Sequence, residues 1–340
     1  MHRTALVTGA TGYIAHHVVQ HLLDAGWHVR ASMRDIGRAE DLRRAVATGG
    51  ADHGARGARM SPVALDLTSD TGWREAMEGV DALVHTASPF PLQQPRNADD
   101  AIRPALDGTR RALAAAQAAG VPRAVVTSSI VAMMNGTPED GRAFGPEDWS
   151  ALDGPMATPY LRSKTLAERE AWRLADEAGA PALTTINPGF VIGPPLGRSW
   201  GTTVEVVSRI LRAKDPAVPP LGFPTVDVRD VAAAHVRALD TDAARGRRIP
   251  TAARFLWMGQ MADAIAAALP HRRIVTRRAP AWLVRGIALF DPAVKSVVPN
   301  LNRRDEVETA TAREVLGLTF RDPLEAVVET ARWLDREGLA

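Results

Sequence analysis

The first fifteen residues restrict the possible folds more than any other stretch of the chain. The apolar run from Thr4 to Thr8 is typical of a buried parallel strand, and it leads directly into G-A-T-G-Y-I-A at residues 9–15. Residues 13–25 then have the pattern of a helix. By themselves, two glycines three apart are compatible with a simple turn. Between a strand and a helix, such a turn lets backbone N–H groups approach a pyrophosphate at the positive end of the helix. The stretch predicts a dinucleotide site formed by Thr8, Gly9, Thr11, Gly12, Tyr13 and Ile14.

The end of the next predicted strand, His28 to Met33, indicates which dinucleotide binds. Arg34 follows this strand, at the place where a dinucleotide-binding fold selects the ribose. An arginine there favours the 2′-phosphate of NADP, whereas an acid favours NAD. Arg38 lies one helical turn further on, as a second contact. Asp35 leaves an alternative open, because it can serve the ribose of NAD or cap the helix predicted at 36–47. The sequence therefore favours NADP (NADPH) and makes NAD the less favoured cofactor.

Strands and helices alternate through about residue 190. Further strands are predicted at 61–67, 81–86, 124–128 and 182–187, a long helix at 99–119, and an irregular connection at 49–59. This order predicts an α/β fold with a Rossmann-type doubly wound parallel sheet. We expect residues 1–190 to form the NADP-binding domain, with 226–250 returning to it. Residues 191–225 and 251–340 then form mainly a smaller C-terminal substrate-binding domain. A carboxylate at the third strand's end, Asp66, can meet the adenine amino group.

Tyr160 and Lys164 are placed four residues apart on a predicted helix and therefore share one of its faces. The chain has only two tyrosines, and its lysines are few beside its arginines. A lysine beside a phenol can lower the phenol's pKa and make it a usable proton donor. The ordinary alternative is a helix surface with a half-buried tyrosine. The loop at 133–156, which precedes this helix, is long enough to line a substrate pocket.

Composition excludes several classes of function. The chain has no cysteine, so disulfides, thiolate catalysis and Cys-ligated metals are excluded. The net charge is only +2 and the basic residues are spread along the chain, which gives no support to nucleic-acid binding. The sequence has no apolar run long enough to span a membrane. We therefore expect a soluble, cytoplasmic protein. His17 and His21 form an i, i+4 pair without a third ligand, so we interpret them as helix-surface residues and expect no metal.

Several fragments together resemble one known superfamily over nearly the whole chain. They are V-T-G-A-T-G-Y-I-A, V-R-A-S-M-R-D, V-H-T-A-S-P-F, V-T-S-S, Y-L-R-S-K, N-P-G-F-V-I-G-P and V-D-V-R-D-V-A-A-A-H. The sequence resembles the extended short-chain dehydrogenase/reductase superfamily, also described as the NAD-dependent epimerase/dehydratase family. Within it, the dihydroflavonol 4-reductase-like branch of ketone and aldehyde reductases is the most similar.

The resemblance implies an NADPH-dependent carbonyl reductase whose substrate is a small ketone or aldehyde. In that role Tyr160 protonates the nascent alkoxide, and Lys164 lowers the pKa of Tyr160 and bonds the nicotinamide ribose. Ser129 holds the substrate oxygen, with its neighbour Ser128 as the alternative. One departure is Asp107, where relatives usually carry asparagine. The further cofactor contacts that the resemblance implies are Leu67, Thr86, Ala87, Ser88, Thr127, Pro188, Gly189 and Val191.

Two other functions remain open at this point. Nucleotide-sugar epimerases and dehydratases share this fold and the tyrosine–lysine pair but hold NAD tightly, and Arg34 counts against them. A non-enzymatic NADP-binding sensor would have no need of Tyr160 and Lys164. The sequence leaves both a monomer and a homodimer possible.

Overall fold

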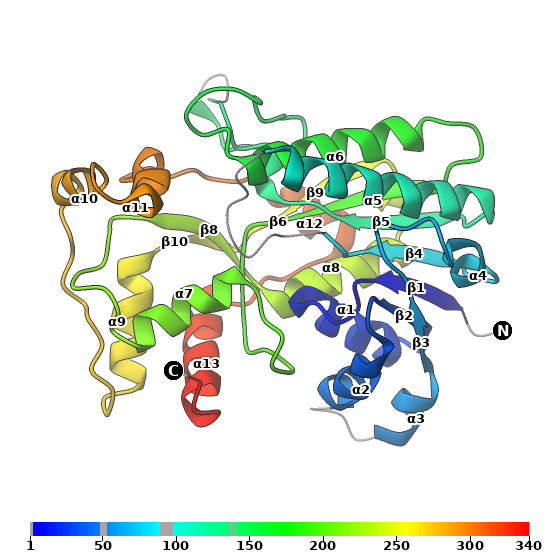
Figure 1. Cartoon of the computed structure of the whole chain (residues 1–340), viewed down its shortest axis with the longest axis horizontal. Helices are drawn as coiled ribbons and strands as arrows, with labels where there is room; N and C mark the ends of the chain where they lie inside the picture. Colours follow the sequence, from blue (N-terminus) through cyan, green and yellow to red (C-terminus); the bar gives the residue numbers. More distant parts are fainter. Residues whose placement is uncertain (1–2, 48–52, 89–97, 137, 139–140, 340) are drawn as a thin grey trace.

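A seven-stranded parallel sheet forms the larger part of the molecule (Figure 1). The computed structural model describes residues 3–47, 53–88, 98–136, 138 and 141–339. The strand order is β3-β2-β1-β4-β5-β6-β9, and every neighbouring pair is parallel. The strands are β1 (Thr4–Thr8), β2 (His28–Met33), β3 (Met60–Ala64), β4 (Ala82–His85), β5 (Arg123–Thr127), β6 (Ala182–Pro188) and β9 (Arg247–Thr251). This is the predicted Rossmann-type fold.

Helices cover both faces of this sheet, as a doubly wound fold requires. One face is buried under α1 (Tyr13–Asp24), α2 (Ala39–Ala47), α8 (Val228–Asp240) and α12 (Ala310–Leu316). The other is buried under α4 (Trp73–Met77), α5 (Asp99–Ala118) and α6 (Pro159–Ala175). The helix α3 (His53–Ala58) occupies part of the stretch 49–59 that we expected to be irregular, so that expectation is wrong for residues 53–58; residues 49–52 lie outside the described part of the chain.

A second, three-stranded sheet contains β7 (Phe190–Ile192), β8 (Gly222–Asp227) and β10 (Arg254–Trp257), in the order β10-β8-β7. We expected residues 226–250 to return to the domain of the main sheet. This is wrong for Val226 and Asp227, which end the central strand of the second sheet. The chain returns to the larger sheet through α8 and β9 instead. An apolar run shows that a strand is buried but not against which layer it packs.

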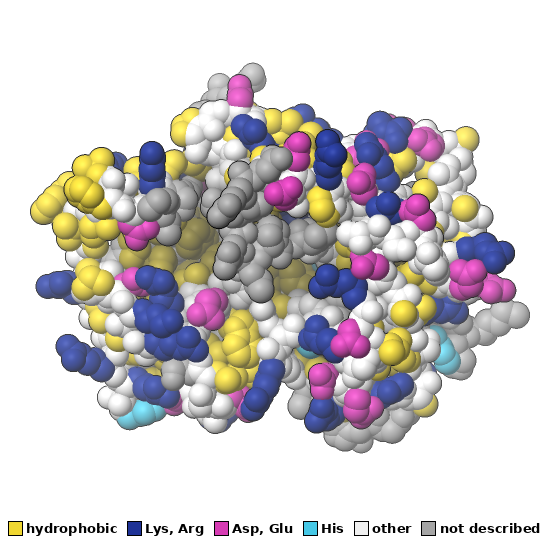
Figure 2. Space-filling view, viewed as in Figure 1, with side chains coloured by type: hydrophobic (Ala, Val, Ile, Leu, Met, Phe, Trp, Pro, Cys, Tyr) yellow, Lys and Arg dark blue, Asp and Glu magenta, His cyan; other side chains and the backbone are white. Residues whose placement is uncertain are grey.

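The remaining helices surround the second sheet. α7 (Thr202–Leu211), α9 (Met258–Ala268) and α13 (Pro323–Arg336) share one apolar core with it. α10 (Ala281–Ile287) and α11 (Pro292–Val297) form an outer corner of the molecule (Figure 1). Figure 2 shows apolar side chains at this corner, and five large ones are exposed there: Trp282, Leu283, Ile287, Leu289 and Phe290.

Candidate active site

The glycine loop between β1 and α1 has the geometry that a phosphate requires. Gly9 has a φ of +63°, and a Cβ at this position would lie 2.9 Å from the Cα and Cβ of Ala87. Gly12 is the N-cap of α1, and no side chain of the described structure caps this helix. The first intrahelical bond runs from the His16 N–H to the Gly12 carbonyl. The N–H groups of residues 13–15 therefore precede the helix's own bonding and can face an anion.

The side chains around this loop hold it together. Thr8 Oγ1 is 2.9 Å from His85 Nδ1 and accepts a bond of 3.2 Å from the Ala87 N–H, while Thr86 Oγ1 donates to the Thr8 carbonyl. The Tyr13 hydroxyl donates to the Gly193 carbonyl at 2.7 Å, and its ring is buried in the second core. Of the predicted cofactor contacts, Thr8 and Tyr13 thus have inward-facing side chains and can offer a ligand only their backbone.

Arginines lie beside the loop at the end of β2. The Arg38 guanidinium is 3.4 Å from Thr11 Oγ1, and Arg34 is exposed. Hydrogen bonds from Thr68 lower the pKa of Asp66, and the charge of Arg34 acts in the same direction. Asp35 accepts a bond of 2.9 Å from the Gly37 N–H and caps the short helix at 36–38, which is one of its two predicted roles.

Ser129 and Tyr160 are hydrogen-bonded to each other at the carboxyl end of the main sheet. Tyr160 comes from the first turn of α6, whose N-cap Thr158 accepts a bond from the Leu161 N–H. The Ser129 hydroxyl also lies 3.5 Å from the Pro188 carbonyl and accepts from the Val131 N–H. Tyr160 as a whole residue is 37% exposed, although its hydroxyl lies in a desolvated environment.

The surroundings do not lower the pKa of Tyr160 as we expected. Desolvation raises the pKa of the Tyr160 phenol, and the bond with Ser129 acts in the opposite direction. Lys164 instead lines a pocket with His85, Ser88 and other residues between β4, β5, α5 and α6. Desolvation lowers the pKa of Lys164 to about 8, although Glu168 opposes this change. The expectation failed because sharing a helix face does not direct an ammonium group at the phenol rather than at the pocket.

Ser128, the alternative to Ser129, faces away from Tyr160. Its hydroxyl donates to Glu168 Oε2 at 2.5 Å. Glu168 also accepts bonds from three other buried side chains, those of Thr185, Asn187 and Arg248. Neither Glu168 nor Arg248 was predicted from the sequence. The only available signal was that Glu168 follows Lys164 by one helical turn, and nothing marked Arg248.

Other predicted cofactor contacts differ in how open they are. Thr127 donates to His235 Nε2 at 2.7 Å, since the other ring nitrogen lies 2.8 Å from the Val231 carbonyl. Val191 is buried in the second core. The Leu67 carbonyl accepts a bond from Arg111, and the side chain of Leu67 packs against Gly108. The side chain of Val191 is therefore structural, whereas Thr127 also lines the Lys164 pocket.

Four predicted residues, in the segments that follow β4 and end β6, lie close to the site. Ala87 and Ser88 line the Lys164 pocket, and Pro188 accepts the weak bond from Ser129. Gly189 follows Pro188, and a Cβ there would lie 2.3 Å from the Pro224 carbonyl oxygen. Asp107, in contrast, is paired with Arg110 on the outer face of α5 and takes no part in this arrangement.

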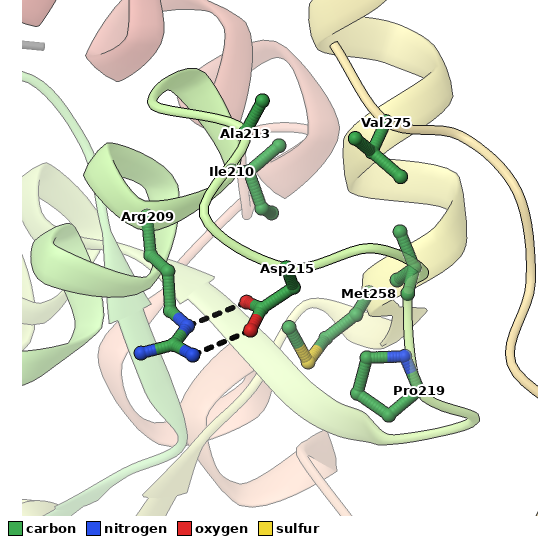
Figure 3. A pocket seen from close by; sticks show the side chains of 8 residues that line it. Arg209, Ile210, Ala213, Asp215, Pro219, Met258 and Val275 are labelled. Atoms are coloured by element: carbon green, nitrogen blue, oxygen red, sulfur yellow. Dashed lines mark hydrogen bonds and ion pairs between the residues drawn. The ribbon is translucent and has the colours of Figure 1, made fainter. Parts of the chain in front are cut away.

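The molecule has a separate small pocket between α7, α9 and the loop that follows α7 (Figure 3). Its lining includes Arg209 and Asp215, whose side chains form an ion pair with each other across two bonds. None of its lining residues belongs to the predicted site.

His17 is not on the helix surface as we expected. It is 2% exposed, and desolvation lowers its pKa to about 3, so the ring is neutral. Within the described residues, no group of three histidine or acidic side chains is arranged to hold a metal. None of the described helices combines the length and apolar character that a membrane crossing requires.

Comparisons with known proteins agree with this architecture. A family model described as "NAD dependent epimerase/dehydratase family" matches residues 5–249. The chain is 32% identical to the ketoreductase azaE of Aspergillus niger over 94% of each chain. It is also 32% identical to cinnamoyl-CoA reductase 1 of Arabidopsis thaliana, over 81% of this chain and 77% of that one. Among solved structures, Gre2 of Candida albicans in complex with NADPH is 25% identical, with a TM-score of 0.80 over 98% of this chain and 99% of that one.

Proposed function

Because this chain belongs to the NAD dependent epimerase/dehydratase family, we propose that it is an NADPH-dependent reductase of ketones or aldehydes. The observation that carries this proposal is the Ser129–Tyr160 hydrogen bond, with Lys164 one helical turn beyond Tyr160. Two hydroxyls in contact can both reach a carbonyl oxygen, which is the atom that gains a proton when a carbonyl is reduced.

The residues of this chain would hold the cofactor at three places. The N–H groups at the start of α1 fit the pyrophosphate, and Arg34 and Arg38 fit a 2′-phosphate beside the glycine loop. Lys164, which lines a pocket with Ser88, would bond the nicotinamide ribose. When bound, NADPH supplies a hydride to the carbonyl carbon. The arginines favour NADP over NAD because both are cationic and Asp35 is engaged as a cap.

The proton steps follow from the surroundings of Tyr160. Since desolvation raises its pKa, Tyr160 holds its proton at neutral pH and can donate it to the substrate oxygen. Ser129 orients that oxygen through its own hydroxyl. The Val131 N–H fixes the Ser129 oxygen, and the 3.5 Å bond to the Pro188 carbonyl is weak enough for the hydroxyl proton to turn to the substrate oxygen.

The test is a panel of ketones, aldehydes and β-keto esters, with NADPH and NADH measured side by side. We expect substrate-dependent oxidation of NADPH and a lower kcat/KM with NADH. Oxidation at the background rate over the whole panel would overturn the proposal. If the purified protein instead carries NAD that does not exchange, an epimerase or dehydratase is favoured.

Replacing Tyr160 tests the proton donor directly. Tyr160→Phe keeps the ring but removes the hydroxyl that bonds Ser129, so kcat should fall about 10²- to 10⁴-fold, the usual contribution of a positioned acid. The dissociation constant of NADPH, measured by fluorescence titration, should change little. Turnover at the wild-type rate would remove Tyr160 from the mechanism.

A further inference from the structure

A buried ion pair lies directly behind the proposed site. Glu168 of α6 and Arg248 of β9 are joined by a bond of 2.7 Å between Oε1 and Nε. The Glu168 side chain is fully buried, and that of Arg248 is 8% exposed. Glu168 follows Lys164 by four residues, just as Lys164 follows Tyr160, so all three share one face of α6.

On one side, the pair holds the strand ends that carry the site. Glu168 accepts bonds from Ser128 Oγ at 2.5 Å and from Asn187 Nδ2 at 2.7 Å. Asn187 Nδ2 also lies 3.3 Å from the Ser129 carbonyl. These residues directly precede or belong to the segments that present Ser129 and Pro188. The carboxylate thereby fixes the ends of β5 and β6 against the helix that carries Tyr160.

On its other side, the pair holds the long loop before α6. Arg248 Nη1 donates to the Pro146 carbonyl at 2.7 Å and to the Asp148 carbonyl at 2.5 Å. The guanidinium also lies 3.8 Å from the centre of the Trp149 ring, within the range of a cation–π contact. One side chain therefore fixes residues 146–149, within the loop predicted to line the substrate pocket.

A second connection ties the same loop to the segment after Ser129. Ser150 Oγ donates to the Val131 carbonyl at 2.7 Å and accepts from the Asn135 N–H at 2.8 Å. The loop is thus attached both behind the site, through Arg248, and beside it.

Stability alone does not account for a fully buried ion pair. Removing two charges from water costs several kcal/mol each, and an apolar pair of similar volume is often as stable or more stable. The bonds of this pair reach the loop on one side and the site on the other. We propose that Glu168 and Arg248 are positioning residues that fix the substrate loop in register with Ser129 and Tyr160. This inference rests on the proposed reductase function.

The first test separates the ion pair of Arg248 with Glu168 from its hydrogen bonds to the loop carbonyls. Arg248→Lys keeps the charge opposite Glu168 but loses the planar fork that reaches the loop carbonyls. We expect KM for the carbonyl substrate to rise about five-fold or more, with kcat within about two-fold of wild type and an unchanged NADPH dissociation constant. Arg247→Lys, an exposed neighbour on the same strand, is the matched control. If Arg248→Lys has the wild-type KM for the carbonyl substrate, the proposal that Arg248 positions the substrate loop is overturned.

The second test separates positioning from stability. The double variant Glu168→Gln with Arg248→Met removes both charges, so its melting temperature should lie closer to wild type than that of Arg248→Met alone, which leaves a buried carboxylate unpaired. We expect its kcat/KM to stay at least about ten-fold below wild type although the fold is retained. Wild-type kcat/KM in the double variant would show that the pair is only structural.

A third measurement does not depend on turnover. Backbone hydrogen exchange over residues 142–150 should be faster in Arg248→Lys than in wild type and Arg247→Lys. If wild type reduces no carbonyl, the proposed function fails, and exchange still decides whether Arg248 fixes the loop. Equal exchange in all three proteins would overturn this inference by itself.

Discussion

Ser128 and Ser129 show how much one residue of register decides. Successive side chains of an extended chain point to opposite sides, so one hydroxyl meets Glu168 and the other meets Tyr160. The sequence predicted that both serines lie at the end of a strand. It left the choice between them open because the strand's last residue determines which side each one faces.

Gly9 is a residue whose replacement should have two separable effects. In Gly9→Ala the positive φ and the approach to Ala87 both become unfavourable, so we expect a loss of about 2 kcal/mol or more in the free energy of unfolding. NADPH binding should weaken as well, because the loop must move. Gly120→Ala is the control, since Gly120 has a similar φ of +67° but open space around it. Equal losses in both variants would show that the contact with Ala87 is unimportant.

The pKa of Lys164 predicts how activity changes with pH on the alkaline side. Its pKa is lowered from 10.5 to about 8, so the ammonium loses its proton as the pH rises through about 8. If the ammonium holds the ribose, kcat/KM for NADPH should fall about ten-fold per pH unit above that point, because this parameter reports on the enzyme without bound cofactor. Lys164→Arg should be less active but should lack this inflection, since an arginine stays charged. An identical inflection in Lys164→Arg would assign it to another group.

Several side chains could not be placed from the sequence. A motif gives positions along the chain, but the directions of Thr127 and Val191 depend on His235 and on the second core, which come from later segments. Glu168 and Arg248 are 80 residues apart, and a lone arginine in an arginine-rich chain carries no signal of its partner.

At the scale of elements, α6 determines where the proposed proton donor stands. Thr158 caps this helix by accepting from the Leu161 N–H at 3.2 Å, one residue beyond Tyr160. Thr158→Ala should cost about 1 kcal/mol of stability, the usual value of an N-cap. Because the first turn carries Tyr160, kcat should fall too, whereas Thr158→Ser should retain both properties. Thermal unfolding and steady-state kinetics measure the two effects. If Thr158→Ala is destabilised but keeps the wild-type kcat, the cap stabilises the helix without positioning Tyr160.

Some elements were predicted closely and others were not. β1, β2, α1 and α5 lie within one residue of their predicted ends, because each has an apolar pattern with a clear boundary. β3 ends at Ala64, three residues before the predicted end, so Asp66 lies in a turn closed by Thr68. β7 and β10 have only three and four residues, and neither was predicted.

At the scale of the whole molecule, the two sheets meet at Gly189. Its N–H donates to the Thr251 carbonyl of β9, and its Cα lies against Pro224 of β8. Gly189→Ala places a methyl group 2.3 Å from the Pro224 oxygen, and we expect a loss of about 1–3 kcal/mol together with impaired turnover. The exposed helical Gly286→Ala should be neutral or slightly stabilising. Urea denaturation compares the free energies of unfolding of the two variants. An unchanged free energy in Gly189→Ala would mean that the contact between the two sheets can accommodate an added methyl group.

The Rossmann half of the molecule followed from the sequence, but the second sheet did not. From β1 to β5, each strand is followed by a helix that covers the sheet, so order along the chain gives order in space. The second sheet joins segments near residues 190, 225 and 255, and it is covered by α13 from the end of the chain. Such long-range pairing leaves no local pattern.

The position of β9 at the edge of the main sheet has a consequence for how the chain folds as it is synthesised. β6 is finished at residue 188, but the strand that covers its edge is made only after residue 247. Until then, a nascent chain that has folded through α6 presents an unpaired strand edge and a Glu168 carboxylate without its guanidinium. A fragment that ends near residue 190 should therefore aggregate or stay loosely packed. During synthesis, α6 can reach its native packing only after Arg248 has been added to the chain.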